Sequence, residues 1–407
     1  MAAGANGNDR PAASVVEAEH ALRTISSRPV LRLPAEDDVL ATLERVATPP
    51  TAPYHEWRAL DAIAAELARL GLAPQRDAYG QLTVRVTRGA PKRALAFVAH
   101  TDHPGFELIE VAGTRGIARF RGGIEPAYFR RPFPVIVHRD GVAEGHRAMA
   151  SGYVHDPVLP DWSAGRCEIQ AQRPLAVGDW AVLDLPVFVR HGDELHLRSA
   201  DDLAGCALIL STLQALAAEA RPFDVHAVFT RAEEPGLFGA RLIAESGGIP
   251  PDAYVVSVEA SNSRYAPAGA GIVVRAGDYH NTFSNDAERF LRVAQEQLAE
   301  QGVPTQRRLL PGGTCEASAF VRLGWMATGI ALPNTGYHNA GEGDALVPEM
   351  IRIEDLLSGI ALSAEAAVAA GADAEESWWP DVRIVPEEIR ARLARSASVH
   401  GKDASAS

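Results

Sequence analysis

The sequence predicts an α/β protein in which a mostly parallel central sheet is flanked by helices and carries an inserted small all-β domain. Two observations lead to this fold class. Short apolar runs rich in β-branched residues alternate with stretches of helical period over most of the chain, which is typical of parallel sheets. Between residues 104 and 196 the helical period is missing, and strand-like segments lie between Gly, Pro and Asp turns.

The first expected helix covers residues 54–71. Apolar residues recur there at spacings of three and four, from Trp57 to Leu70, and Gly71 ends the pattern. Because only one face of this helix is apolar, we expect it to pack on the sheet. Further helices are expected at 203–219, 236–246, 285–301 and 348–370, and a short one at 386–395.

The expected strands of the sheet are the apolar runs themselves. They lack a clean alternation of polar and apolar residues, which suits strands buried on both faces. They lie at 82–86, 95–99, 225–229, 254–258 and 328–332. Within the inserted segment, shorter strands are expected at 133–138, 180–185 and 194–197.

This pattern divides the chain into four parts. The small, polar and charged residues at the start indicate a disordered tail, and the C-terminal extension ends in polar low-complexity sequence that we also expect to be disordered. The predicted parts are the tail at 1–30, the α/β domain at 31–103 plus 197–372, the inserted domain at 104–196 and the extension at 373–407.

Composition excludes several classes of protein. The formal net charge is −13, and no cluster of Lys and Arg forms the basic surface that a nucleic-acid-binding protein needs. No apolar run approaches the roughly 18 residues of a membrane span. The first residues lack the apolar segment of an export signal, so we expect a cytoplasmic protein that contacts neither nucleic acid nor membrane.

The cysteines limit the kind of metal site that the chain can build. There are only three, and they are widely separated, so they form neither a disulfide framework nor a thiolate zinc site. Any metal must therefore be held by histidines and carboxylates.

Polar side chains follow the expected strands at the positions where each strand ends. His100 and Asp102 follow the run 95–99, Glu233 and Glu234 follow 225–229, Glu259 follows 254–258, His338 follows 328–332, and Asp201 begins a helix. Ligands bind outside the carboxyl ends of strands in open α/β sheets, so one cleft would collect all of these residues. Taken singly, each has an ordinary alternative: an adjacent Glu pair is usually solvated, and Asp201 or Asp202 could cap the helix.

These residue types suit a centre with two divalent ions. Such a centre needs a bridging carboxylate, for which Asp201 is suited, and terminal His or carboxylate ligands. Asp102 could accept the second N–H of His100 and orient its ring. In the pair Glu233 and Glu234, one carboxylate can bind metal while the other takes a proton from water.

Several motifs, taken in order and spacing, resemble one peptidase family. The segments AHTDHPGF, SADDLAGCALIL, AEEPGLFGA, SVEAS, GGTCEASAF and GYHNAGEGD are similar to those of the tetrahedral aminopeptidases, which include deblocking and glutamyl aminopeptidases. This family is part of the co-catalytic dinuclear zinc metallopeptidase clan. The resemblance runs from about residue 36 to 370. Members carry a β-barrel-like insertion where this chain has residues 104–196.

The resemblance implies a role for each site residue. It implies that His100, Asp201 and Glu259 bind one ion and that Asp201, Glu234 and His338 bind the other. Glu233 would be the general base, Asp102 would orient His100, and the Asp201–Asp202 peptide bond would be cis. The family usually has Asp at the position of Glu259.

The expected function is removal of amino-terminal residues from short peptides. A hydroxide held between two divalent ions would attack the carbonyl, with Glu233 as general base. Zn²⁺ is expected first, with Co²⁺ or Mn²⁺ as alternatives, and the resemblance implies a homo-oligomer. Two other functions stay open: a metal-dependent deacylase or amidohydrolase acting on a non-peptide amide, and a catalytically idle metal-binding assembly protein.

Overall fold

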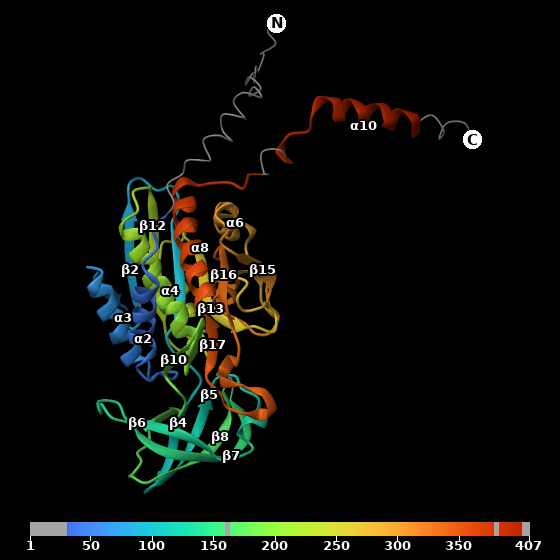
Figure 1. Cartoon of the computed structure of the whole chain (residues 1–407). Coiled ribbons are helices and arrows are strands. Elements are labelled where there is room, and N and C mark those ends of the chain that lie inside the picture. Colours follow the sequence, from blue (N-terminus) through green and yellow to red (C-terminus); the bar gives the residue numbers. More distant parts are fainter. Residues whose placement is uncertain (1–30, 159–162, 378–381, 401–407) are drawn as a thin grey trace.

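The fold is described from a computed structural model, which describes residues 31–158, 163–377 and 382–400 (Figure 1). An α/β unit forms the upper part of the view, and a β-barrel lies below it. The tail expected at 1–30 and the end of the C-terminal extension lie outside the described residues. The expected domain boundaries remain predictions.

The α/β unit is built on an eight-stranded sheet with the order β1-β2-β12-β3-β13-β16-β14-β15. Its four central strands, β12, β3, β13 and β16, are parallel to one another. The fold class predicted from the sequence is therefore confirmed. The strands are β1 (Gln75–Arg76), β2 (Leu82–Arg88), β3 (Leu95–His100), β12 (Phe223–Thr230), β13 (Tyr254–Asn262), β14 (Ile272–Gly277), β15 (Thr305–Leu309) and β16 (Ala327–Asn334).

Helices cover both faces of this sheet. One face packs against α2 (Glu36–Ala47), α3 (Trp57–Arg69), α4 (Ala200–Ala217), α6 (Asn285–Glu300) and α8 (Ile353–Ala372). The other face packs against α5 (Phe238–Ser246) and α7 (Glu316–Arg322). In β3, Phe97 contributes to the first core and its neighbour Val98 to the second. Burial on both faces explains why these strands are apolar without alternation.

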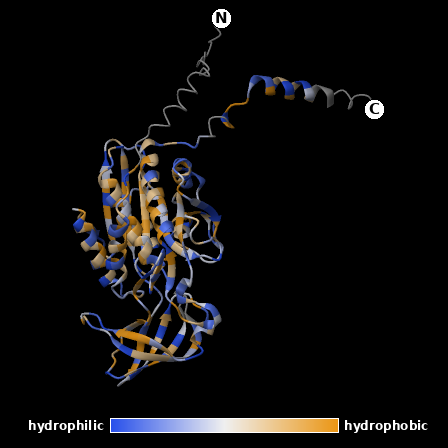
Figure 2. Cartoon of the chain, viewed as in Figure 1, coloured by the Kyte–Doolittle hydropathy of each residue, from blue (hydrophilic) through white to orange (hydrophobic). Residues whose placement is uncertain are grey.

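Two of these helices, α4 and α8, are long and apolar enough by length and composition to cross a membrane. In both, however, 89% of the apolar window is buried inside the protein. Figure 2 shows the hydrophobic residues along these helices and the strands behind them. They are therefore core helices of the α/β unit. The expected cytoplasmic location remains a prediction.

The β-barrel closes through six strands in the order β4-β5-β8-β7-β6-β9. Four phenylalanines contribute to its interior: Phe106 and Phe129 each contact the rings of the other three, which include Phe120 and Phe133. The strands are β4 (Gly105–Ala112), β5 (Arg115–Arg121), β6 (Phe133–His138), β7 (His146–Val158), β8 (Ser163–Ala171) and β9 (Trp180–Leu183), with the 3₁₀ helix η1 (Pro126–Phe129) between β5 and β6.

A three-stranded sheet lies between the two units. It joins β10 (Phe188–His191), β11 (Glu194–Leu197) and β17 (Glu349–Arg352). The helix expected from residue 348 is wrong in its first turn, because residues 349–352 pair with β11 and the helix begins at Ile353. Helices α2 and α7 were not expected. Two 3₁₀ turns, η2 (Tyr337–Asn339) and η3 (Glu342–Asp344), precede β17, and α10 (Glu387–His400) lies in the C-terminal extension.

Candidate active site

His100 lies at the centre of a first group of acidic side chains. It ends β3, and its Nε2 lies 3.3 Å from Asp201 Oδ1 and 3.7 Å from Glu259 Oε2. Glu233 Oε2 lies 4.0 Å from the same nitrogen. Glu259 comes from β13, the neighbour of β3 in the sheet, and Asp201 comes from the first turn of α4. His100, Glu233 and Glu259 offer ligand atoms within 4.8 Å of one another.

His338 forms a second group with Asp201 and Glu234. Its Nε2 lies 3.4 Å from Asp201 Oδ2 and 3.4 Å from Glu234 Oε1. Its Nδ1 is hydrogen-bonded to the carbonyl oxygen of Gly123, which lies in the barrel segment. Asp201 offers one oxygen to each histidine, so its carboxylate lies between the two groups. The Asp201–Asp202 peptide bond is cis, as the resemblance implies.

Asp102 contacts the site in a way that the sequence did not suggest. Its two carboxylate oxygens accept hydrogen bonds from the backbone N–H groups of Glu233 and Glu234, both at 3.0 Å. His100 Nδ1 lies 3.2 Å from the carbonyl oxygen of Asp102 and 3.6 Å from Oδ1. The Asp102 side chain therefore positions the Glu pair, and its backbone carbonyl is the nearer partner of the imidazole.

Glu349 is a buried carboxylate that sequence reasoning missed. Its Oε2 accepts the backbone N–H of Asp201 at 2.9 Å, and its Oε1 accepts the backbone N–H of His338 at 2.7 Å. Asn334 Nδ2 donates to the same Oε1 at 3.0 Å. Glu349 thus fixes the backbone of one residue in each half of the site. Burial raises the pKa of Glu349 to about 8, and repulsion from Asp201 adds to this effect.

His103 and Asn339 support Asp201 from the other side. His103 Nδ1 lies 2.6 Å from the carbonyl oxygen of Asp201, and its Nε2 lies 2.9 Å from Asn339 Oδ1. Asn339 Nδ2 donates in turn to the carbonyl oxygen of Arg198 at 2.9 Å. Burial lowers the pKa of His103 to about 4.

The site contains more buried carboxylates than buried histidines, and this excess shifts their pKa values. Burial raises the pKa of Glu233 well above its ordinary value, and repulsion from Glu259 and Glu234 adds to this effect. Burial likewise raises the pKa of Glu234 to about 8. Burial lowers the pKa of His338, but attraction to Glu234 and the contact with Asp201 outweigh it and raise the pKa to about 10. Additional positive charge would therefore stabilise the ionised acids and displace these protons.

The donor set fits divalent cations. Two imidazoles and four carboxylates converge without a thiolate, which suits Zn²⁺, Co²⁺ or Mn²⁺. Asp201 Oδ1 and Glu234 Oε1 are buried, and apart from the long contacts with the two histidines at 3.3 and 3.4 Å they have no partner among the described residues. Buried carboxylate oxygens normally have a partner, so these two atoms are the ones that a cation would be expected to engage.

A small pocket opens beside Glu259. Arg275 contributes to its wall and is only 3% exposed. One guanidinium nitrogen donates to Ser261 Oγ at 3.3 Å, but Nε has no partner and no carboxylate forms an ion pair with Arg275 in the described part of the chain. Gly312 and Gly313 also line this pocket. The nearby charges of Glu259 and Asp278 favour the protonated form of Arg275. A buried cation at this place is suited to an anionic ligand.

All seven residues predicted from the sequence thus lie in one place. The side chain of His338 is 11% exposed. The other six residues are each at most 7% exposed: His100, Asp102, Asp201, Glu233, Glu234 and Glu259. The metal and catalytic roles assigned to them remain proposals. The residues that sequence reasoning missed are Glu349 and Arg275. The sequence signal for Glu349 is a single acidic residue in the segment PEMIRI, which we interpreted as the start of a helix.

The chain was also compared with models of known protein families. The family described as M42 glutamyl aminopeptidase matches residues 80–346 of the chain.

Solved structures with the same fold include an aminopeptidase from an archaeon and two structures described as TET1. The aminopeptidase APDkam598 from Desulfurococcus kamchatkensis is 19% identical, with a TM-score of 0.67 over 86% of this chain and 99% of that one. The Pyrococcus horikoshii TET1 peptidase, described as assembling into a tetrahedron or a large octahedral shell, is 21% identical, with a TM-score of 0.66 over 81% of this chain and 99% of that one. PhTET1-12s, described as a dodecamer, is 21% identical, with a TM-score of 0.66 over 81% of this chain and 98% of that one. At these identities the likeness concerns the fold.

Proposed function

The chain belongs to the M42 glutamyl aminopeptidase family and is a peptide hydrolase, and from this premise we propose that it removes amino-terminal residues from short peptides with two bound divalent ions. The observation that carries the proposal is the position of Asp201, which offers one carboxylate oxygen to the His100 group and the other to the His338 group. A carboxylate shared in this way is what a pair of neighbouring ions requires.

The two ions would be held by five side chains, with Asp201 shared between them. We propose His100, Asp201 and Glu259 for one ion and Asp201, Glu234 and His338 for the other. Divalent ions bound there would polarise the carbonyl of the scissile bond and acidify a water molecule. Zn²⁺ is the ion we expect first, with Co²⁺ or Mn²⁺ as alternatives.

Glu233 is the proposed general base. Its carboxylate is buried beside His100 Nε2, and its raised pKa suits a group that takes a proton and later returns it to the leaving amine. Asp102 holds the backbone of Glu233 and Glu234 through two hydrogen bonds. Both carboxylates of the Glu pair are thereby kept in a fixed orientation toward the histidines. Because Glu233 also belongs to a potential ligand group, the metal content of a Glu233 variant separates the roles of base and ligand.

The pocket beside Glu259, with a volume of about 20 Å³, is the proposed site for the charged end of an acidic amino-terminal side chain. It adjoins the metal ligand, and its buried Arg275 has no ion-pair partner in the described chain. We therefore propose a preference for Asp or Glu at the amino terminus of the peptide. The glutamyl activity named for the matched family is of the same kind.

We also propose a homo-oligomer. Support comes from the described assemblies of the similar structures, one a dodecamer and one a tetrahedron or octahedral shell. The mass of the purified protein by multi-angle light scattering tests this point. A mass equal to one chain would end the proposal.

The deciding experiment uses a mixed peptide library, half with free and half with acetylated amino termini, incubated with the protein and Zn²⁺, Co²⁺ or Mn²⁺. Mass spectrometry should detect stepwise loss of amino-terminal residues from the free peptides only. Release of acetate from the blocked peptides would instead favour the deacylase function. A library left intact with every metal would favour the idle assembly protein.

A further inference from the structure

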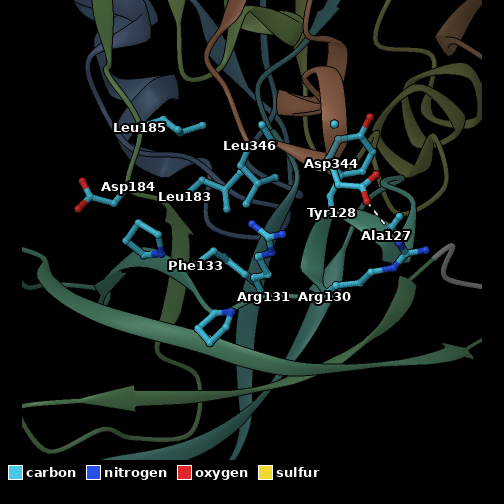
Figure 3. Close-up of a pocket in the computed structure, with 14 residues that line it drawn as sticks. Ala127, Tyr128, Arg130, Arg131, Phe133, Leu183, Asp184, Leu185, Asp344 and Leu346 are labelled. Atoms are coloured by element: carbon cyan, nitrogen blue, oxygen red, sulfur yellow. Dashed lines mark hydrogen bonds and ion pairs between the residues drawn. The ribbon is translucent and has the colours of Figure 1, made fainter.

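A large cavity lies between the barrel and the loop that follows His338. Residues 339–348, here called the 339–348 loop, connect His338 to β17. The loop and the barrel segment from η1 to β6 enclose a space of about 450 Å³ (Figure 3). Its apolar wall is formed by Phe133, Leu183, Leu185 and Leu346.

Arg131 supplies the uncompensated charge of this cavity. In Figure 3 its guanidinium points into the space between Leu346 and Tyr128. Among the described residues no carboxylate forms an ion pair with Arg131. The other charges in the wall are paired, because Arg130 lies 3.3 Å from Asp344 and Asp184 lies 2.9 Å from Arg147. The cavity thus combines an apolar wall with one solvent-exposed guanidinium that forms no ion pair with a described residue.

This cavity adjoins, at Tyr128, a second cavity that reaches His338 of the candidate active site. The second cavity, of about 430 Å³, is lined by His338, Tyr337 and Gly123, and Tyr128 lines both spaces. The Tyr128 hydroxyl donates to the carbonyl oxygen of Gly341 at 3.2 Å, which ties the barrel to the 339–348 loop. A peptide that starts at the metal site would reach Arg131 by passing His338 and crossing Tyr128.

We propose that Arg131 binds the terminal carboxylate of peptide substrates whose amino terminus lies at the metal site. This inference rests on the proposed aminopeptidase function and names its substrate class: unblocked oligopeptides with an apolar C-terminal residue. A guanidinium pairs with a carboxylate through two parallel hydrogen bonds. The leucines and Phe133 would cover the apolar side chain next to that carboxylate.

A consequence concerns substrate length. The amino terminus and the carboxylate are held at two fixed places, so only a limited range of peptide lengths can reach both. Each round of hydrolysis shortens the peptide by one residue. The benefit of Arg131 should therefore appear within one window of lengths and vanish below it.

The test compares peptides of increasing length in two forms, with a free and with an amidated C-terminus. For wild-type protein, we expect kcat/KM to be about tenfold higher for the free form within the length window. The Arg131→Gln variant should lose this ratio, and Arg131→Lys should keep part of it, since Lys retains the charge without the planar fork. The matched control is Arg115→Gln, which removes an exposed barrel arginine outside the cavity and should leave both the ratio and the activity unchanged.

The result can fail in two distinguishable ways. Equal rates for free and amidated peptides at every length, or a ratio that persists in Arg131→Gln, would overturn the role of Arg131 while leaving the aminopeptidase intact. Absence of any cleavage would overturn the proposed function. In that case the same peptides are titrated by calorimetry into metal-loaded Glu233→Gln protein. We expect peptides with a free C-terminus to bind more tightly than amidated ones, and this difference to be lost when Arg131 is also replaced. Equal binding of the two forms would refute the role of Arg131.

Discussion

The side chain of Glu349 accepts a hydrogen bond from the backbone N–H of Asp201 at 2.9 Å. The same carboxylate accepts the backbone N–H of His338 at 2.7 Å, so a group that offers no ligand atom holds two proposed ligands in place. Partners of this kind orient metal ligands and affect the affinity for the ion.

Glu349→Ala should weaken metal binding by about 10- to 100-fold, because the backbone of both proposed ligands loses its anchor. Glu349→Gln should have a smaller effect, since one amide oxygen remains as an acceptor. Competition with a chromophoric chelator measures the affinity without using turnover. Glu354→Gln, an exposed acid on α8, is the control. Unchanged affinity in Glu349→Ala would show that the hydrogen bonds are not needed to hold the site.

Glu233→Gln should retain its metal but lose turnover by about 10²- to 10⁴-fold, because the amide cannot take the proton of the attacking water. Elemental analysis and peptide hydrolysis are measured on the same sample. Loss of one metal equivalent would make Glu233 a ligand instead of a base. Full activity would exclude both roles.

Arg275→Gln should reduce the preference for acidic over apolar amino-terminal residues by about tenfold. The ratio of kcat/KM for glutamyl and leucyl peptides is the appropriate measure, since a general loss of stability would lower both values together. Arg275→Lys should preserve part of the preference. If the ratio is the same in all three proteins, the pocket does not select by charge.

The protein should lose stability as the pH falls from about 6.5 to about 4, in part through His138. Burial lowers the pKa of His138 to about 4, and the nearby charges of Arg58 and Arg198 add to this effect. Between the ordinary value of 6.5 and this lower value the unfolded chain binds a proton that the folded chain does not, so acid favours unfolding.

His138→Phe keeps a ring against Trp180, which His138 contacts at 4.8 Å between ring centroids, but it removes the titration. The free energy of unfolding, measured with urea at about pH 7 and about pH 4.5, should therefore change less in this variant than in wild type. His191→Phe, at an exposed position, is the control. An identical change in all three proteins would contradict the role of His138.

Asp140→Ala should destabilise the contact between the barrel and the start of α3. Asp140 accepts hydrogen bonds from the indole N–H groups of Trp57 at 3.0 Å and Trp180 at 2.9 Å, and it lies 3.2 Å from His55 Nδ1. Since Trp180 is fully buried, the loss of its acceptor should cost about 1–3 kcal/mol. Urea denaturation measures this cost, and Asp61→Ala at an exposed position should leave the stability nearly unchanged.

The proposed ligands could be grouped from the sequence because of how the sheet orders its strands. β12, β3, β13 and β16 are parallel neighbours, with Thr230 opposite His100 and Glu259 opposite Ala331. Residues that end such strands must meet at one edge. Each apolar run therefore indicated both a strand and the position of the polar residue that follows it.

Glu349 and Arg131 could not be recognised in the same way. Glu349 lies 11 positions after His338 and acts through backbone N–H groups, which carry no residue-type signature. Arg131 faces a cavity that exists only once the barrel packs against the 339–348 loop. For Asp102 the short spacing suggested a contact with the His100 ring, and its Oδ1 lies 3.6 Å from Nδ1. Its hydrogen bonds to the backbone N–H groups of Glu233 and Glu234, in the turn after β12, could not be expected from the spacing. Such contacts depend on tertiary packing and not on local pattern.

The barrel also separates the proposed ligands in the order of synthesis. His100 precedes it, Asp201 follows it, and His338 comes after all eight strands of the sheet. A ribosome therefore makes the first ligand well before the last, and the complete ligand set exists only after the final core strand has been translated.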